Sequence, residues 1–245
     1  CEALAPHLLH SALAGADPSG QVPVTLWMHR GCVPFVSPRD FRDIYWATLR
    51  PILQEIWAQG HQVLLYAEGT WAAHLESFAE LPDHSVIFHV DRTDLERVRR
   101  VLGGRFCLSG GIPNDLLTTG TPAQVRARCR QVIETLGADG GYILDASALI
   151  MDDARVENVE AVVEAALEFG VYSRAASPAA WPPGPPPTPS QPTVARTRMP
   201  PGVCVPWEEK RLEFPEITGD ESVARRAWEA VDGMGYGFLW TNLTW

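Results

Sequence analysis

Hydrophobic and polar positions follow one repeating pattern between residues 22 and 170. A short run of apolar residues comes first, then a polar or glycine-containing turn, and then a segment whose apolar residues recur every three or four positions. Uninterrupted apolar runs are typical of strands buried on both faces, and the second spacing is typical of amphipathic helices. The pattern predicts five strands, at Val22–Met28, Gln62–Ala67, Ser85–Val90, Arg105–Ser109 and Gly141–Leu144.

The helix after the first strand carries the clearest signals. Ser37 can cap its N-terminus, and Pro38 suits its first position. Apolar residues with helical spacing continue to Ile56, and Gly60 can end the helix in the left-handed conformation. Because proline inside a helix removes a backbone hydrogen bond, we expect a kink at Pro51.

Two later helices begin with the spacing of a capping box. Thr93 stands three residues before Glu96, and Thr121 stands three residues before Gln124. In such a box the two side chains satisfy each other's backbone amides at the start of the helix. The two remaining helices are expected near Ala72–Glu80 and over Arg155–Phe169.

Strands without polar alternation, each followed by a helix, predict a parallel sheet covered by helices. A doubly wound sheet and a (β/α) barrel both fit this order. No glycine-rich dinucleotide-binding motif follows any of the strands, which favours the barrel. We therefore expect an α/β fold, a partial TIM (β/α)8-type barrel with about five of the eight β/α units of a complete one.

The sequence changes in kind after residue 173. Ten prolines fall between Ser177 and Pro201, and such a stretch is typical of an extended, semi-rigid linker. Beyond it, one helical pattern covers Glu221–Val231, with too little apolar content to fold alone. We expect a barrel part at 1–173, a Pro-rich linker at 174–202 and a C-terminal helical segment at 203–245 that docks on the barrel or on a partner.

Charge and composition narrow the partners. A net charge of −10 argues against a nucleic-acid surface, and no apolar run reaches the ~18 residues of a membrane span. The five cysteines are widely spaced, with no C-x-x-C pair, which indicates reduced thiols in a cytoplasmic protein. We expect a small-molecule substrate, with no nucleic acid and no membrane as partner, and leave an oligomer open.

Residues 107–172 carry several motifs in a fixed order, and matching residues occur upstream. The motifs are GGIP at 110–113, LLTTGTP at 116–122, GGYIL at 140–144, ENV at 157–159 and FGVY at 169–172; upstream they are His29-Arg30-Gly31, Glu68-Gly69 and 88–94. In this order, over about residues 1–172, the chain resembles the C-terminal part of the uroporphyrinogen decarboxylase (URO-D) superfamily barrel. The resemblance implies a TIM barrel of which about three N-terminal units are absent from this chain.

The resemblance implies two chemistries, from both of which this sequence departs. One is decarboxylation of uroporphyrinogen, and the other is methyl transfer between corrinoid proteins and thiols, with zinc held by an H-x-C pair and a later cysteine. The H-x-C positions fall on Tyr66-Ala67-Glu68, and the later cysteine, histidine in the decarboxylases, falls on Ala148. A thiol-activating zinc site is therefore disfavoured, since zinc prefers soft ligands for that role. The sequence is most similar to the branch associated with corrinoid-dependent demethylation, so a corrinoid on a partner protein is the expected cofactor.

Polar residues follow the predicted strands, at the barrel rim where such enzymes hold their chemistry. We expect His29, Glu68 and Asp91 to be catalytic, as general acids or bases. His29 and Glu68 are also candidate ligands of a divalent metal, and we expect them within about 10 Å of each other, the reach of a small pocket. Residues expected to bind substrate are Arg30, Tyr66, Arg92, Asn114 and Asp145.

Structural interpretations of three of these residues remain open. Asp91 and Arg92 can form an ion pair, and Asp145 can cap the next turn. His89 lies inside an apolar strand and fits a core histidine.

Three functions of the chain remain open: a corrinoid-linked methyltransferase or demethylase, a tetrapyrrole decarboxylase, or a non-catalytic subunit or inactive fragment whose Trp-rich tail binds a partner.

Overall fold

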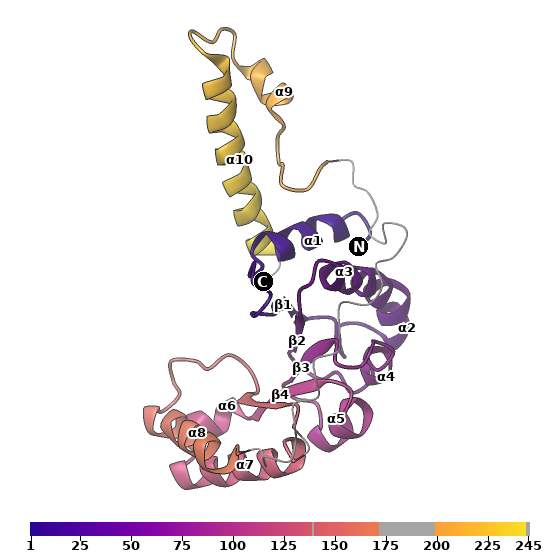
Figure 1. Cartoon of the computed structure of the whole chain (residues 1–245), viewed down its shortest axis with the longest axis vertical. Coiled ribbons are helices and arrows are strands. Elements are labelled where there is room, and N and C mark those ends of the chain that lie inside the picture. Colours follow the sequence, from indigo (N-terminus) through magenta and orange to yellow (C-terminus); the bar gives the residue numbers. More distant parts are fainter. Residues whose placement is uncertain (139, 172–198, 244–245) are drawn as a thin grey trace.

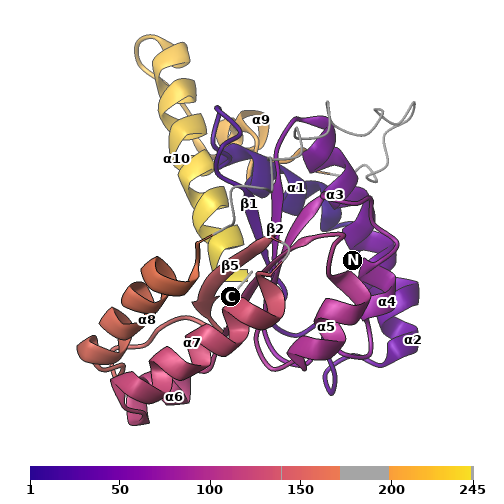
Figure 2. The same ribbon diagram turned by 60° about the horizontal axis from the view of Figure 1, so that its bottom comes forward.

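The computed structural model describes the backbone of residues 1–138, 140–171 and 199–243, and side chains to residue 240. Its centre is one parallel sheet with the strands in sequence order (Figures 1 and 2), as the sequence predicted. The strands are β1 (Val24–Trp27), β2 (Val63–Ala67), β3 (Val86–Val90), β4 (Cys107–Ile112) and β5 (Tyr142–Ala146). The architecture is therefore the predicted α/β one, a part of a (β/α) barrel.

Helices follow the strands and cover one face of the sheet (Figure 2). Val63 and Leu65 of β2 and Phe88 of β3 point to this face and are fully buried. The ring of Phe88 lies 5.1 Å from that of Phe78 in the helix after β2. The helices between and after the strands are α3 (Ala47–Ala58), α4 (Leu75–Phe78), α5 (Leu95–Leu102), α6 (Asn114–Thr119), α7 (Pro122–Leu136) and α8 (Val156–Phe169).

The segment before α3 departs from the predicted single helix. Ser37 caps α2 (Pro38–Asp40), with its hydroxyl accepting from the Asp40 amide at 3.1 Å. A π-helical turn, η1 (Phe41–Trp46), follows, and α3 then continues through Pro51. The helix is therefore broken into three parts before Pro51, and a kink at Pro51 itself stays a prediction.

One of the two predicted capping boxes is wrong. Asp94 caps α5 by accepting from the Arg97 amide at 2.8 Å. The hydroxyl of Thr93 is buried one residue earlier and accepts instead from the Trp71 amide, also at 2.8 Å. The box at the start of α7, between Thr121 and Gln124, is present as predicted.

Strand β4 begins two residues later than predicted and ends three residues later, at Ile112, because Gly110 and Gly111 extend it. Gly110 and Gly111 have φ values of +95° and +98° and lie inside the strand. A Cβ at Gly110 would lie 2.3 Å from the Val90 carbonyl oxygen, so a larger residue would push β3 and β4 apart. The GGIP motif, which follows the predicted strand, is therefore mostly strand.

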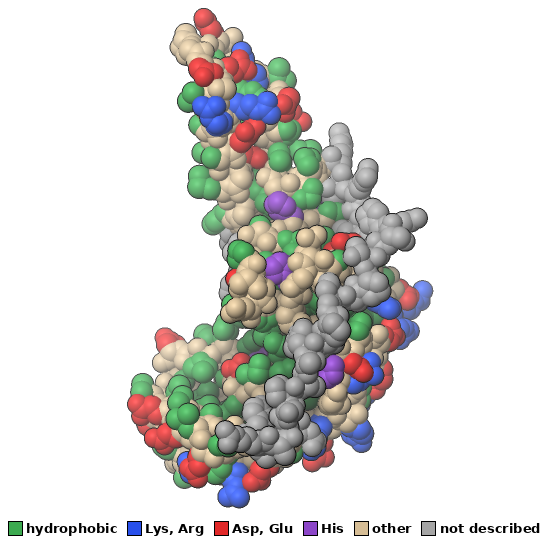
Figure 3. All heavy atoms as spheres, viewed as in Figure 1, with side chains coloured by type: hydrophobic (Ala, Val, Ile, Leu, Met, Phe, Trp, Pro, Cys, Tyr) green, Lys and Arg blue, Asp and Glu red, His purple; other side chains and the backbone are tan. Residues whose placement is uncertain are grey.

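The C-terminal segment lies against α1 (Ala5–Ala14). It contains α9 (Trp207–Lys210), the 3-10 turn η2 (Arg211–Glu213) and α10 (Glu221–Leu243), a helix longer than the predicted one. Nδ1 of His7 lies 2.8 Å from the Tyr236 hydroxyl, and the His7 ring stacks on Trp240 at 5.1 Å. The far end of α10 projects from the sheet together with α9 (Figure 1) and carries charged side chains (Figure 3). Residues 174–198 of the predicted linker lie outside the described residues. No described helix is long and apolar enough to cross a membrane.

Candidate functional site

Two rows of side chains lie across the face of the sheet opposite to the helices. Strand register aligns Trp27 of β1 with Tyr66 of β2, Tyr66 with His89 of β3, and His89 with Ser109 of β4. Phe88 points to the helices, so its neighbour His89 points to the other face, because successive strand residues alternate. The predicted site residues stand two positions further along three of these strands, at His29, Glu68 and Asp91.

His29 and Glu68 contact each other directly at the ends of β1 and β2. Nδ1 of His29 lies 2.7 Å from Oε2 of Glu68, well inside the separation expected from the sequence. A carboxylate only accepts, so Nδ1 carries the proton and Nε2 is the nitrogen available for chemistry. No hydrogen bond joins Nε2 to another described residue, and the two side chains are 26% and 41% exposed. Glu68 therefore fixes the orientation of the His29 ring, and Nε2 of that ring stays accessible to a ligand.

A stack of three rings, those of Trp27, Tyr66 and His89, lies next to this pair on the same face of the sheet. Tyr66 stacks between Trp27, at 4.4 Å, and His89, at 4.0 Å. Such offset stacking favours a fixed ring orientation. Burial raises the pKa of Tyr66 to about 12, helped by the charges of Asp145, Glu68 and Asp91, so its phenol keeps its proton at neutral pH.

His89 is buried in the middle of the polar groups and has a defined tautomer. Its Nε2 lies 3.0 Å from the Ser147 carbonyl oxygen, which only accepts, so Nε2 carries the proton. Nδ1 then accepts from the Ser109 hydroxyl at 3.3 Å. Burial lowers the pKa of His89, which keeps the ring neutral, although Asp145 lies 3.7 Å from Nδ1.

Asp91 and Asp145 make structural contacts in addition to facing Tyr66. Asp91 accepts from the Gly69 amide at 2.8 Å, and burial raises the pKa of its carboxyl. The guanidinium of Arg92 lies 3.8 Å from it and is 80% exposed. Oδ1 of Asp145 accepts from the Ala146 amide at 2.8 Å. The structural interpretations of both carboxylates therefore describe real contacts, and a role for either in catalysis or substrate binding stays a prediction.

Three predicted substrate-binding residues lie away from the ring stack. Arg30 and Arg92 are exposed at the outer edge of the rim. Asn114 donates to the Leu149 carbonyl and accepts from the Ala148 amide, so it holds the loop after β5. The structure brings together His29, Glu68, Tyr66, Asp91 and Asp145, and leaves these three side chains outside the group.

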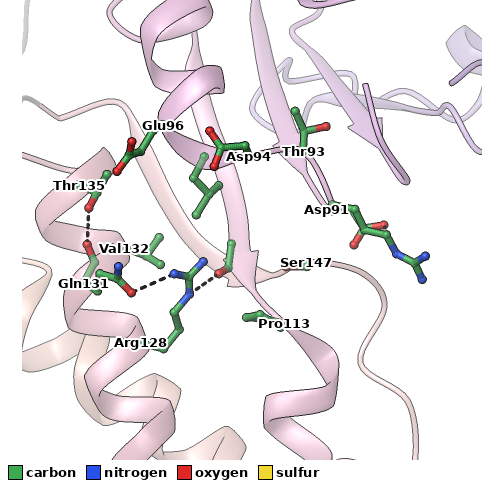
Figure 4. A pocket seen from close by; sticks show the side chains of 13 residues that line it. Asp91, Thr93, Asp94, Glu96, Pro113, Arg128, Gln131, Val132, Thr135 and Ser147 are labelled. Atoms are coloured by element: carbon green, nitrogen blue, oxygen red, sulfur yellow. Dashed lines mark hydrogen bonds and ion pairs between the residues drawn. The ribbon is translucent and has the colours of Figure 1, made fainter. Parts of the chain in front are cut away.

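Two cavities adjoin the rim. A cavity of about 660 Å³ lies between α1, β1, α3 and α10, and Trp27 and His29 are among the residues that line it. A second one, of about 270 Å³, lies between α5 and α7 on the helix side of β4 (Figure 4). Asp91 and Arg92 line it, and Arg128 donates there to the Gly111 carbonyl and to Gln131.

Comparisons with known proteins identify the family. The model of the uroporphyrinogen decarboxylase (URO-D) family matches residues 26–169, more than half of the chain. The chain belongs to the URO-D family. A solved structure described as a methyltransferase from Methanosarcina mazei is similar, with a TM-score of 0.50 and 21% identity over 65% of this chain. The match spans 44% of that structure, less than half its length. A search of curated proteins finds no match.

The zinc site of URO-D-type methyltransferases does not fit the residues present here. The H-x-C positions hold Tyr66 and Glu68, and Tyr66 is stacked between two rings. Across the described part of the chain, no group of three His, Cys, Asp or Glu side chains is placed to hold a metal ion. His29 and Glu68 bond each other, which occupies Nδ1 of the one and Oε2 of the other. We therefore derive no step through a metal.

Sequence reasoning assigned no role to Trp27, and it placed His89 in the core, where the structure shows it fully buried and hydrogen-bonded at both ring nitrogens. Both precede a predicted site residue by two positions, as Tyr66 does. Since side chains two apart share one face of a strand, this spacing was the available signal.

Proposed function

We propose that this URO-D family chain carries the rim of a corrinoid-linked methyltransferase or demethylase, with His29 and Glu68 as its acid–base pair. The observation that carries the proposal is the 2.7 Å contact between these two side chains, of which His29 lines the larger cavity. A fixed imidazole whose second nitrogen faces a ligand is the usual form of a general acid or base.

Methyl transfer needs a proton at a definite place. When a methyl group leaves an oxygen or sulfur atom, that atom keeps the bonding electrons and requires a proton, which protonated Nε2 of His29 would supply. In the reverse direction the same nitrogen would remove the proton of a thiol or hydroxyl acceptor. Glu68 would stabilise the positive imidazole and hold its orientation. A corrinoid bound to a partner protein would supply the methyl-accepting or methyl-donating centre.

The phenol of Tyr66 would serve as a second hydrogen-bond donor. It is protonated at neutral pH, and three carboxylates surround it. A substrate with many carboxylates would meet repulsion there, while Arg30 and Arg92 point to solvent. This charge arrangement supports methyl transfer over decarboxylation of a tetrapyrrole.

The test follows methyl transfer from methylcob(III)alamin to a small thiol by loss of the methylcobalamin absorbance. We expect His29→Asn to lower the rate ~100-fold or more and Glu68→Gln to lower it ~10-fold or more, because positioned acid–base groups contribute ~10²–10⁴. Arg39→Gln, on the exposed surface of α2, is the matched control. Carbon dioxide release from uroporphyrinogen without methyl transfer would support the decarboxylase instead. A wild-type chain inactive in both assays would support the non-catalytic alternative.

A further inference from the structure

The larger cavity is built by parts of the chain that lie far apart in sequence. Its walls come from α1, β1, α3 and α10. Its volume of about 660 Å³ lies within the ~300–1,000 Å³ typical of small-molecule sites. Apolar residues that line it include Leu4, Leu8, Leu26, Leu49, Ile52 and Trp240.

The charge of the lining restricts the ligand. Among the described residues that form these walls, none is Asp, Glu, Lys or Arg. A charged ligand buried there would lose its water and would find no permanently charged side chain as a partner, which is costly. The polar residues of the lining include His29, which pairs with Glu68, together with His10, Thr25 and Thr48. The lining therefore suits an uncharged molecule with an apolar body.

Helix α10 gives this cavity a wall that the family match does not include. The URO-D model ends at residue 169, whereas α10 begins at Glu221. Contacts of Tyr236 and Trp240 with His7 hold the helix on α1. Gly233 lines the cavity, and a Cβ built there would have no neighbouring atom within 4 Å. A side chain at this position would therefore start in open space at the cavity wall.

We propose that α10 completes a binding site for an uncharged, largely apolar organic molecule, whose heteroatom lies at His29. The binding follows from the cavity alone, and only the placement of the heteroatom rests on the proposed function. The C-terminal segment would then select the substrate, while the rim residues carry the chemistry.

The test compares two ligands and two glycine variants in the full chain. We expect 2-methoxynaphthalene to bind in equilibrium dialysis and 6-methoxy-2-naphthoate, its carboxylate analogue, to bind at least tenfold more weakly. Gly233→Leu should weaken binding of 2-methoxynaphthalene at least tenfold. The matched control is Gly235→Leu, in the same helix, equally unobstructed and not part of the lining; it should stay within twofold of wild type. Both changes replace glycine by a better helix former, so folding should be preserved, as thermal melts will show.

Two results would overturn the proposal. One is equal binding by the two glycine variants, and the other is binding of the carboxylate as tight as that of the neutral ether. Loss of binding in Gly233→Leu without methyl transfer by any form of the protein would uphold the site and reject the proposed function. Methyl transfer by both forms, with the same KM in Gly233→Leu as in wild type, would uphold the proposed function and reject the binding site.

Discussion

Asn158 offers a quantitative test of how the structure holds the rim region together. It lies in the first turn of α8 and is fully buried. Its side-chain amide donates to the carbonyl oxygens of Leu117 at 2.8 Å and Gly120 at 2.9 Å, at the C-terminal end of α6. Carbonyls at a helix end lack intrahelical partners, so Asn158 supplies them from another helix. The Asn158→Leu variant keeps the size of the side chain and removes both bonds.

The magnitude follows from these contacts. Each bond contributes ~1 kcal/mol, and a buried carbonyl left without a partner costs ~1–3 kcal/mol. The Leu117 carbonyl also accepts from the Arg155 amide, so chiefly the Gly120 carbonyl is left unsatisfied. We expect Asn158→Leu to lower the free energy of unfolding by ~2–4 kcal/mol.

Replacing Asn158 by aspartate should cost more at neutral pH. The introduced carboxylate would face carbonyl oxygens, and an unpaired buried charge costs ~3–5 kcal/mol. Burial would raise the pKa of this carboxyl above its unfolded value. The folded state therefore prefers the protonated carboxyl. The loss in free energy of unfolding relative to wild type should be smaller at pH 4 and should grow towards pH 7.

Urea denaturation followed by circular dichroism measures these differences. The matched control is Glu160→Gln, an exposed position on the same helix, for which we expect a change below ~0.5 kcal/mol. An Asn158→Leu variant as stable as this control would refute the capping role of Asn158.

Three further predictions concern stability. The pKa of His89 is lowered by burial, so the unfolded chain binds its proton more tightly and the free energy of unfolding should fall as the pH drops below about 6.5; in urea titrations at several pH values, His89→Gln should reduce this slope. Part of the slope should remain because burial also lowers the pKa of His74. Thr121→Ala removes the capping box of α7 and should cost ~1 kcal/mol in the same assay, whereas an unchanged midpoint would contradict the box. Asp232 accepts from the amides of residues 204–205, so Asp232→Ala should speed hydrogen exchange at those two amides while exchange in β2 stays as in wild type.

The sheet was predictable because its strands are short apolar runs separated by clear helix signals. All five strands occur near their predicted positions, in the predicted order. The errors are local and have long-range causes. Thr93 has the spacing of a cap, but the amide of Trp71, 22 residues away in sequence, takes its hydroxyl. Gly110 reads as a turn residue, but the close approach of the Val90 carbonyl requires it inside β4.

The candidate site was predictable only in part. The order of parallel strands placed His29 and Glu68 on one rim, and the structure brings them into contact. The ring stack depends on register between strands, which a run of apolar letters does not specify. The larger cavity depends on α10, whose position on α1 is set by contacts between residues more than 200 positions apart.

The two rows of the site have a consequence for how this sequence can vary in evolution. Because the rim residues and the ring stack share one face by a strict count of two, inserting or deleting one residue within β1, β2 or β3 would turn His29, Glu68 or Asp91 towards the helices and bring aliphatic side chains into their place. Substitutions in these strands can be compensated singly, but changes of length cannot. Differences in length among related proteins should therefore be confined to the segments between strands. Each rim residue should remain two sequence positions after the ring residue of its strand.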